Sequence, residues 1–502
     1  MSGREEPTAV LSGGMTTVYR RRLESLREQA RKRFDHGATG IQIAGGLSAE
    51  LDRLILEMWD EALQRLNPAE RQLLNEQSAI AAVGGSGRGE LAPYSDVDLL
   101  FLYQPAVETL FSDVISVLVR DFWDVGLKVG HSVRSVRDAA ATAKQDIQFG
   151  TSLVELRPLC GSAAVVGQLL RRFQRDVQRS RRDPFIAECI QSRQAERQES
   201  GGAVLQLEPD IKRSFGGLRD LHLIRWIGFA HYGAGDLDSL RLRGVLSKDD
   251  ARRLSIALDY LLTLRINLHF HAGRPHDILT RDDQLRVSQE RAIPATEGMR
   301  PVECFMQEYF RHSLFVAEMA DRFVARHQRR AWSRQMVDSL MTIRIDDVYR
   351  VRPQWITIPR RHRNSACGSV EGALRLYLTA ARYRVLPDYD LTEWIKQQVP
   401  YYSITLSAEG QETFLQILAT PGRLGSILRS MFIAWAVGTG VAPVRAYSLP
   451  FAVQSIPLVH RGRAYVSDDR ERGGAGNGCG TAWPGLPGNP PQGNPAPGAA
   501  VA

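Results

Sequence analysis

Residues 83–102, VGGSGRGELAPYSDVDLLFL, place four glycines just before two aspartates that are two positions apart. The apolar run after the second aspartate is typical of a buried strand. Backbone amides approach an anion closely only where no Cβ intervenes, so a glycine-rich loop after a strand indicates phosphate binding. Carboxylates at i and i+2 of a strand share one face, about 7 Å apart, and can bind Mg²⁺ together. This stretch favours an α/β unit that binds a nucleoside triphosphate.

Two other phosphate-binding motifs fit this loop poorly. A Walker A loop ends in Gly-Lys-Ser/Thr, and this loop has no lysine. A dinucleotide fingerprint can be counted from Gly87 to Ala92, but Pro93 and a strand follow where a helix is required. The structural alternative is that Asp96 serves an Asx turn and Asp98 is merely exposed. The buried strand that adjoins the loop argues against it, and we therefore predict both aspartates to be catalytic, metal-binding residues.

A second element, LEPDIKRSFGGLRDLHLIRW at residues 207–226, strengthens the interpretation. Together the two motifs resemble the bacterial PII uridylyltransferases of the DNA polymerase beta-type nucleotidyltransferase superfamily. The resemblance implies Mg²⁺-dependent transfer of UMP from UTP to a tyrosine of the PII nitrogen-regulatory protein. Two alternatives stay open: a transferase that uses another nucleotide or acceptor, such as adenylyl transfer, and an inactive PII-binding remnant.

The resemblance also implies roles for individual residues. Asp96 and Asp98 bind the metal, and a third catalytic carboxylate is expected on a later strand. Glu155, in LVELRPLCG, is our candidate, with a surface ion pair to Arg157 as the alternative. Ser86 stands where the family usually has tyrosine. The predicted nucleotide-binding residues are Gly84, Gly85, Ser86, Gly87, Arg88, Gly89, Lys212, Arg219 and Asp220.

The predicted fold is α+β, a polymerase beta-type nucleotidyltransferase domain with helical domains before and after it. Leucines at three- and four-residue spacing predict the helices, and short β-rich runs such as VDLLFLY and SLVELRPL predict the strands. The expected segments are an N-terminal helical part (1–75), the nucleotidyltransferase domain (76–165), a helical associated domain (166–335), a helical remnant (336–430) and a low-complexity tail (431–502).

The tail suggests a frameshift. Codons that encode residues 454–471 and 486–502 can be chosen so that reading from the second base of each gives another amino-acid sequence. These shifted sequences resemble the family's His-Asp phosphohydrolase domain. We therefore expect this chain to lack the UMP-removing and glutamine-sensing domains of the full-length family. His276-Asp277 is expected to be an ordinary pair near a helix end, and not a hydrolase ligand.

Charge and cysteine content indicate the protein's partners and cellular compartment. The net charge is +8, but clusters such as RRRLESLREQARKR alternate with acids and leucines, which is typical of a solvated helix face. We therefore predict no nucleic-acid partner. The five cysteines are scattered without metal-ligand spacing, which favours a reducing compartment. The longest apolar stretch, residues 431–444, is too short to span a membrane. The sequence predicts a cytoplasmic protein without a membrane partner.

Overall fold

The structure is a computed structural model that describes residues 13–200, 206–295, 299–327, 343–352, 355–402, 406–422 and 424–438. Within these ranges the chain is a helix-rich α+β protein, as predicted. Residues 439–502, which include most of the segment we interpret as a frameshifted tail, lie outside them. None of the described helices is long and apolar enough to cross a membrane.

A four-stranded mixed sheet holds the two-aspartate motif. Its strands, in the order β3-β2-β1-β4, are β1 Ser78–Ala82, β2 Val97–Tyr103, β3 Val129–Ser135 and β4 Arg157–Gly161. β1 pairs antiparallel with β2 and β4, and β2 pairs parallel with β3. The parallel register sets Asp98 of β2 opposite Gly130 of β3. The sheet thus brings the start of β3 beside Asp98.

Side chains alternate across β2, so the sheet is buried on both faces. Leu99 and Phe101 join one hydrophobic core. Leu100 and Leu102 join the other. Both cores include helices that lie far away in the sequence. Packing on both faces therefore fixes the position of β2, whose first residues include Asp98.

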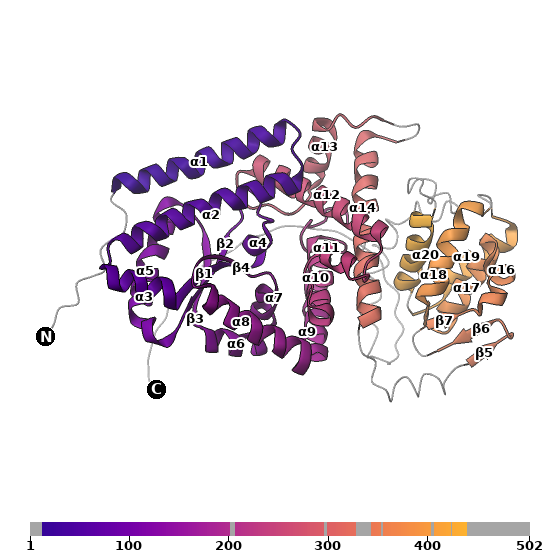
Figure 1. The fold of residues 1–502 in the computed structure, drawn as a ribbon. Coiled ribbons are helices and arrows are strands. Elements are labelled where there is room, and N and C mark those ends of the chain that lie inside the picture. Colours follow the sequence, from indigo (N-terminus) through magenta and orange to yellow (C-terminus); the bar gives the residue numbers. More distant parts are fainter. Residues whose placement is uncertain are drawn as a thin grey trace, which may run out of the picture. The chain divides into compact units, whose positions relative to one another are not determined.

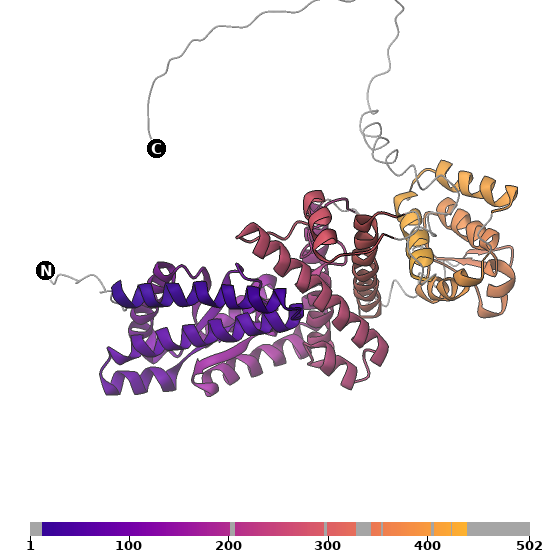
Figure 2. The ribbon, with the colours of Figure 1, turned by 90° about the horizontal axis from the view of Figure 1, so that it is seen from above.

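In the described part of the chain three helices precede the sheet, where the sequence predicted a helical segment. They are α1 Gly13–Asp35, α2 Gly40–Gln64 and α3 Pro68–Gln77. Capping boxes at Thr39 and Asn67 fix where α2 and α3 begin. α1 and α2 lie side by side in Figures 1 and 2. α2 contributes side chains to both cores, with Ile43 in one and Leu54 in the other, so it ties the two together.

Further helices lie between and after the strands, up to the second motif. They are α4 Gly84–Arg88, η1 Pro105–Val107, α5 Glu108–Val125, α6 Val136–Gln145, α7 Ile147–Val154, α8 Ala163–Arg175, the π-helical turn η2 Asp176–Ser180 and α9 Arg182–Glu199. α7 corrects an expectation, because the run SLVELRPL was predicted to be β-rich. Asp146 caps α7 by accepting hydrogen bonds from the Gln148 and Phe149 amides, and only Arg157 onward is strand.

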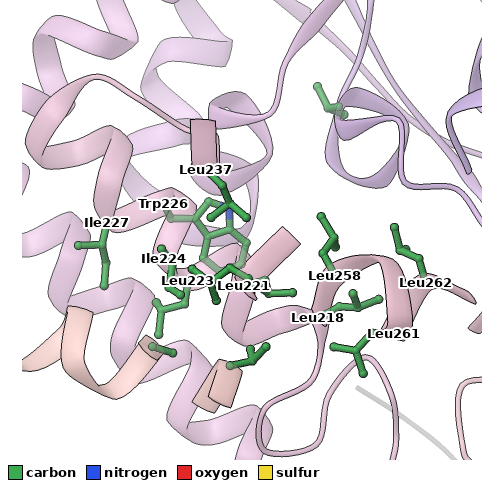
Figure 3. Close-up of a cluster of buried hydrophobic side chains, with 14 of the residues drawn as sticks. Leu218, Leu221, Leu223, Ile224, Trp226, Ile227, Leu237, Leu258, Leu261 and Leu262 are labelled. Atoms are coloured by element: carbon green, nitrogen blue, oxygen red, sulfur yellow. The ribbon is translucent and has the colours of Figure 1, made fainter. Parts of the chain in front are cut away.

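The second motif opens a helical bundle. Its helices are α10 Leu218–Tyr232, α11 Leu237–Leu242, α12 Lys248–Ala272, α13 Arg281–Glu290 and α14 Pro301–His327. Figure 3 shows part of their core, which includes Leu221 and Ile224 of α10 and Leu258 of α12. The same core includes Leu100 of β2. The bundle and the sheet therefore pack as one body around a shared interior.

Residues 343–438 form a further group that sequence analysis predicted only as helical. Its elements are β5 Ile343–Ile345, β6 Tyr349–Val351, β7 Trp355–Thr357, α16 Arg360–Cys367, α17 Val370–Arg382, β8 Leu386–Pro387, α18 Tyr389–Gln398, η3 Val399–Tyr401, α19 Ala408–Ala419 and α20 Leu424–Gly438. The small sheet, in the order β5-β6-β7-β8, was not predicted. Its strands have two or three residues each, too few to show a period of two.

Candidate active site

A cleft of about 810 Å³ lies where the glycine loop, β2, β3, α7 and the second motif meet. Eight of the predicted site residues line it, namely Gly84, Gly85, Arg88, Asp96, Asp98, Glu155, Lys212 and Arg219. These residues come from positions as far apart as 84 and 219. The fold therefore gathers the two motifs around one cavity, whose volume lies within the range of ordinary small-molecule sites.

Two glycines confine the Asp98 side chain. A Cβ on Gly84, whose φ is +56°, would lie 2.9 Å from Asp98 Oδ2. A Cβ on Gly130 would lie 2.8 Å from Asp98 Oδ1. The Ser86 hydroxyl accepts a hydrogen bond of 2.9 Å from the Asp98 amide and so anchors the strand to the loop. The carboxylate thus fits only because both neighbours lack side chains.

Asp96 and Asp98 place two carboxylates in the cleft, and neither has a direct partner in the described part of the chain. Among the described residues, no side chain or amide forms a hydrogen bond or ion pair with either carboxylate. Burial raises the pKa of Asp98, Lys212 lowers it, and the nearby charges of Asp96 and Glu155 raise it again. Negative charges crowded in a half-buried site favour binding of a cation.

The donors fit Mg²⁺ better than they fit a metal held by protein alone. No group of three or more His, Cys, Asp or Glu is arranged as a metal site within the described ranges. Mg²⁺, however, is ordinarily bound by one or two carboxylates together with substrate phosphates and water. Asp96 and Asp98 supply the two carboxylates, and the glycine loop adjoins them. A metal role for this pair stays a prediction that the geometry supports.

A buried network of charges links the glycine loop to α10. Glu90 accepts from Arg88 Nε at 2.8 Å and from Arg225 Nη1 at 2.6 Å, and it lies 3.2 Å from His222 Nε2. Arg88 also pairs with Glu155. Burial alone would raise the pKa of Glu90, but Arg225, Arg88 and His222 hold it well below its usual value. Glu90 therefore stays ionised, and its contacts lock the two motifs together.

Glu155 is not on a strand, which corrects our expectation. It is the C-cap residue of α7 and precedes β4. Its carboxylate pairs with Arg88 and accepts from Trp226 Nε1 at 2.9 Å, and its side chain is 5% exposed. The alternative of a surface pair with Arg157 is also wrong, because Arg157 Nη1 lies 2.7 Å from Asp52 Oδ2. Glu155 does reach the cleft, so its role as a third carboxylate stays a prediction.

The predicted cationic residues enter the cleft from the second motif. Arg219 lies on one face of α10 with His222 and Trp226, at positions i, i+3 and i+7. Its guanidinium stands 6.0 Å from the Trp226 ring centre. Among the described residues no carboxylate lies within 4.0 Å of the Lys212 ammonium. Burial, Arg265 and Arg219 lower the pKa of Lys212 to about 8. An ammonium without an ion pair, in the same cleft as two unpaired carboxylates, suits a metal-bound phosphate chain.

Four predicted nucleotide-binding residues do not line the cleft: Ser86, Gly87, Gly89 and Asp220. Gly89 ends α4 with φ +69°, and a Cβ on Gly87 would lie 2.0 Å from the Glu155 carbonyl oxygen. Asp220 is fully buried, where Arg193 Nε donates to it at 2.5 Å and the Gly216 amide at 2.7 Å. The structure gives these four residues roles in shaping the loops, while contact with a nucleotide stays untested.

Sequence analysis missed the residues that contact the predicted site residues from distant positions in the sequence. Gly130, Glu90, His222 and Arg225 all surround the predicted residues, yet none was singled out. Glu90 and His222 lie within the two quoted motifs. Their ionisable side chains inside a motif were the signal that could have identified them. Gly130 gave no local signal, because its role depends on the parallel pairing of β2 with β3.

Comparison with known proteins finds relatives of one kind. Residues 184–324 match the model of the GlnD PII-uridylyltransferase family, a range that includes the second motif. A bifunctional uridylyltransferase/uridylyl-removing enzyme of Rhodospirillum rubrum is 35% identical over 300 residues, 60% of this chain and 32% of that protein. Proteins of the same description from Cereibacter sphaeroides and Phenylobacterium zucineum are 37% and 32% identical over 56% and 59% of this chain.

These similarities identify the chain as a homologue of nucleotidyltransferase enzymes. More narrowly, it is related to the PII-uridylyltransferases, as the two motifs indicated. The chain spans about a third of the length of these relatives, 32% of the first and 31% of the second.

Proposed function

We propose that this chain transfers UMP from UTP to a tyrosine of a PII nitrogen-regulatory protein and releases pyrophosphate. The observation that carries the proposal is the pair of unpaired carboxylates, Asp96 and Asp98, in a cleft that also holds the unpaired Lys212. The family match and the printed names of the relatives support uridylyl transfer as the reaction.

The proposed reaction is an in-line displacement at the α-phosphorus of UTP. The tyrosine oxygen forms a bond to this phosphorus, and the bond from the phosphorus to the bridging oxygen of the β-phosphate breaks. Pyrophosphate leaves with that oxygen, and the tyrosine proton passes to a carboxylate or to water. When bound by Asp96 and Asp98, Mg²⁺ would neutralise charge on the phosphate oxygens. Lys212 and Arg219 would hold the phosphate chain against that pair.

Pyrophosphate release tests the proposal and separates its alternatives. The purified chain is incubated with Mg²⁺, a PII protein and each of UTP, ATP, CTP or GTP in turn. We expect release with UTP, and only when PII is present. Preference for ATP would indicate the adenylyl-transferring alternative. No release with any nucleotide, from a folded chain that still binds PII, would contradict the proposal and favour the inactive remnant.

Gly130→Ala should lower the transfer rate about tenfold or more, because its new Cβ would push against Asp98 Oδ1. Gly130 has no positive φ and is exposed, so the free energy of unfolding should change little. Gly45→Ala is the matched control, since a Cβ there meets nothing within 4 Å. Initial rates and thermal melts of both variants check the prediction. Equal rates for the two variants would show that Asp98 needs no fixed position.

The pH profile should report Lys212. Its ammonium is charged below pH 8 and loses its proton as the pH rises through about 8, so phosphate binding weakens there. We expect kcat/KM for UTP to fall above about pH 8 in the wild type, since this parameter reports the free enzyme. Lys212→Arg keeps its charge and should keep kcat/KM level over the same range. Identical profiles would exclude Lys212 as the titrating group.

A further inference from the structure

A second cavity, of about 270 Å³, lies beside the active-site cleft. α1 and α2 form one side of it, and the loop before Asp96, the turn before β3 and the loop after α12 form the rest. Its apolar wall consists of Leu23, Leu26, Leu47, Leu51 and Leu127. The volume is close to the lower end of the range for small-molecule sites, roughly 300–1,000 Å³.

Three cations line this cavity without a carboxylate to neutralise them. They are Arg27, Lys128 and Arg274. Among the described residues, no acid lies within 4.0 Å of any of the three. Other arginines in this part of the chain, such as Arg22, Arg31 and Arg53, are paired with acids even at exposed positions. Arg21 and Arg33 of α1 form no described ion pair either, so what distinguishes Arg27, Lys128 and Arg274 is that they surround a cavity with an apolar wall.

Arg27 is the cation that the fold holds in place. Its Nε donates to the Pro93 carbonyl at 3.1 Å, and its guanidinium lies 4.9 Å from the Tyr94 ring centre. Burial lowers the pKa of Arg27. These contacts leave the two Nη atoms without a described acceptor. Neither Nη atom is buried, so both are open to a bound anion, which would accept charge-assisted hydrogen bonds from them.

We propose that this cavity binds a small organic anion with an apolar body, such as an aryl carboxylate, its carboxylate at Arg27 and its body against the leucines. Lys128 and Arg274 add positive charge at the rim. Ser95 and Pro275 line both this cavity and the active-site cleft. A ligand here therefore contacts the segment that leads directly into Asp96. The site is separate from the carboxylates and cations proposed to act on UTP.

Isothermal titration calorimetry with 1-naphthoate tests the proposal without requiring any enzymatic activity. The neutral analogue 1-naphthamide is the ligand control. Arg27→Gln removes the charge, Leu26→Trp fills the cavity, and Lys128→Gln alters an exposed cation should the other two fail to fold. Arg31→Gln is the matched protein control, because Arg31 is one turn away on α1 and pairs with Asp35.

We expect 1-naphthoate to bind at one site per chain and 1-naphthamide to bind at least about tenfold more weakly. Arg27→Gln and Leu26→Trp should each weaken naphthoate binding about tenfold or more, Lys128→Gln should weaken it less, and Arg31→Gln should leave it unchanged. No binding at millimolar naphthoate would overturn the proposal. Equal binding of the amide, or undiminished binding by all three cavity variants, would also overturn it.

Discussion

Asp98→Asn should reduce nucleotide transfer by at least about a thousandfold, or roughly 4 kcal/mol of transition-state stabilisation. The amide keeps the shape of the carboxylate in the space between Gly84 and Gly130 but removes the negative charge that Mg²⁺ requires. No described residue pairs with the Asp98 carboxylate, so its loss breaks no ion pair in the folded chain. Rates of pyrophosphate release measure the effect, and thermal melts show whether the fold survives.

Asp113→Asn is the matched control for that experiment. Asp113 lies on α5, is exposed and does not line the cleft. Its replacement should leave both the rate and the melting temperature unchanged. If Asp98→Asn retained more than about a tenth of the wild-type rate, Asp98 could not be a metal-binding residue.

Glu90→Gln should destabilise the protein by about 3–5 kcal/mol, the second large effect we expect. The Glu90 side chain is 8% exposed, and Arg88 and Arg225 beside it are each 11% exposed. The amide cannot balance these two charges, which would remain buried without enough negative charge nearby. Urea denaturation measures the change in the free energy of unfolding.

Glu50→Gln is the comparison for Glu90→Gln. Glu50 pairs with Arg53 on the surface of α2, where their side chains are 43% and 64% exposed. Loss of that pair should cost at most about 1 kcal/mol. Equal destabilisation by the two variants would show that the network between the glycine loop and α10 contributes no more than a surface ion pair.

The sequence predicted those parts of the fold whose signal is local. The continuous apolar run in VDLLFLY produced the buried strand β2 as expected, and leucine spacing produced α1 and α2. The helix α7 was missed because its cap, Asp146, precedes a run rich in β-forming residues. The cap satisfies backbone amides that a strand would have paired elsewhere, and packing of α7 against α9 overrides local propensity.

The site residues likewise fall into those with a local sequence signal and those without one. Asp96, Asp98 and Lys212 were predicted because each lies in a motif whose residue types indicate metal or phosphate binding. All three line the cleft. The ion pairs around Glu90 join residues 88 to 225, and no periodicity in one sequence encodes such a pairing. Long-range electrostatics and strand register decide these contacts, so they became visible only in three dimensions.

The intact mass of PII after incubation with this chain, UTP and Mg²⁺ tests the central claim most directly. We expect every modified PII subunit to gain the mass of one UMP, on a tyrosine located by peptide mapping, and no gain with Asp98→Asn. An unchanged PII mass, obtained with folded wild-type chain and intact UTP, would contradict uridylyl transfer by the cleft that Asp96 and Asp98 define.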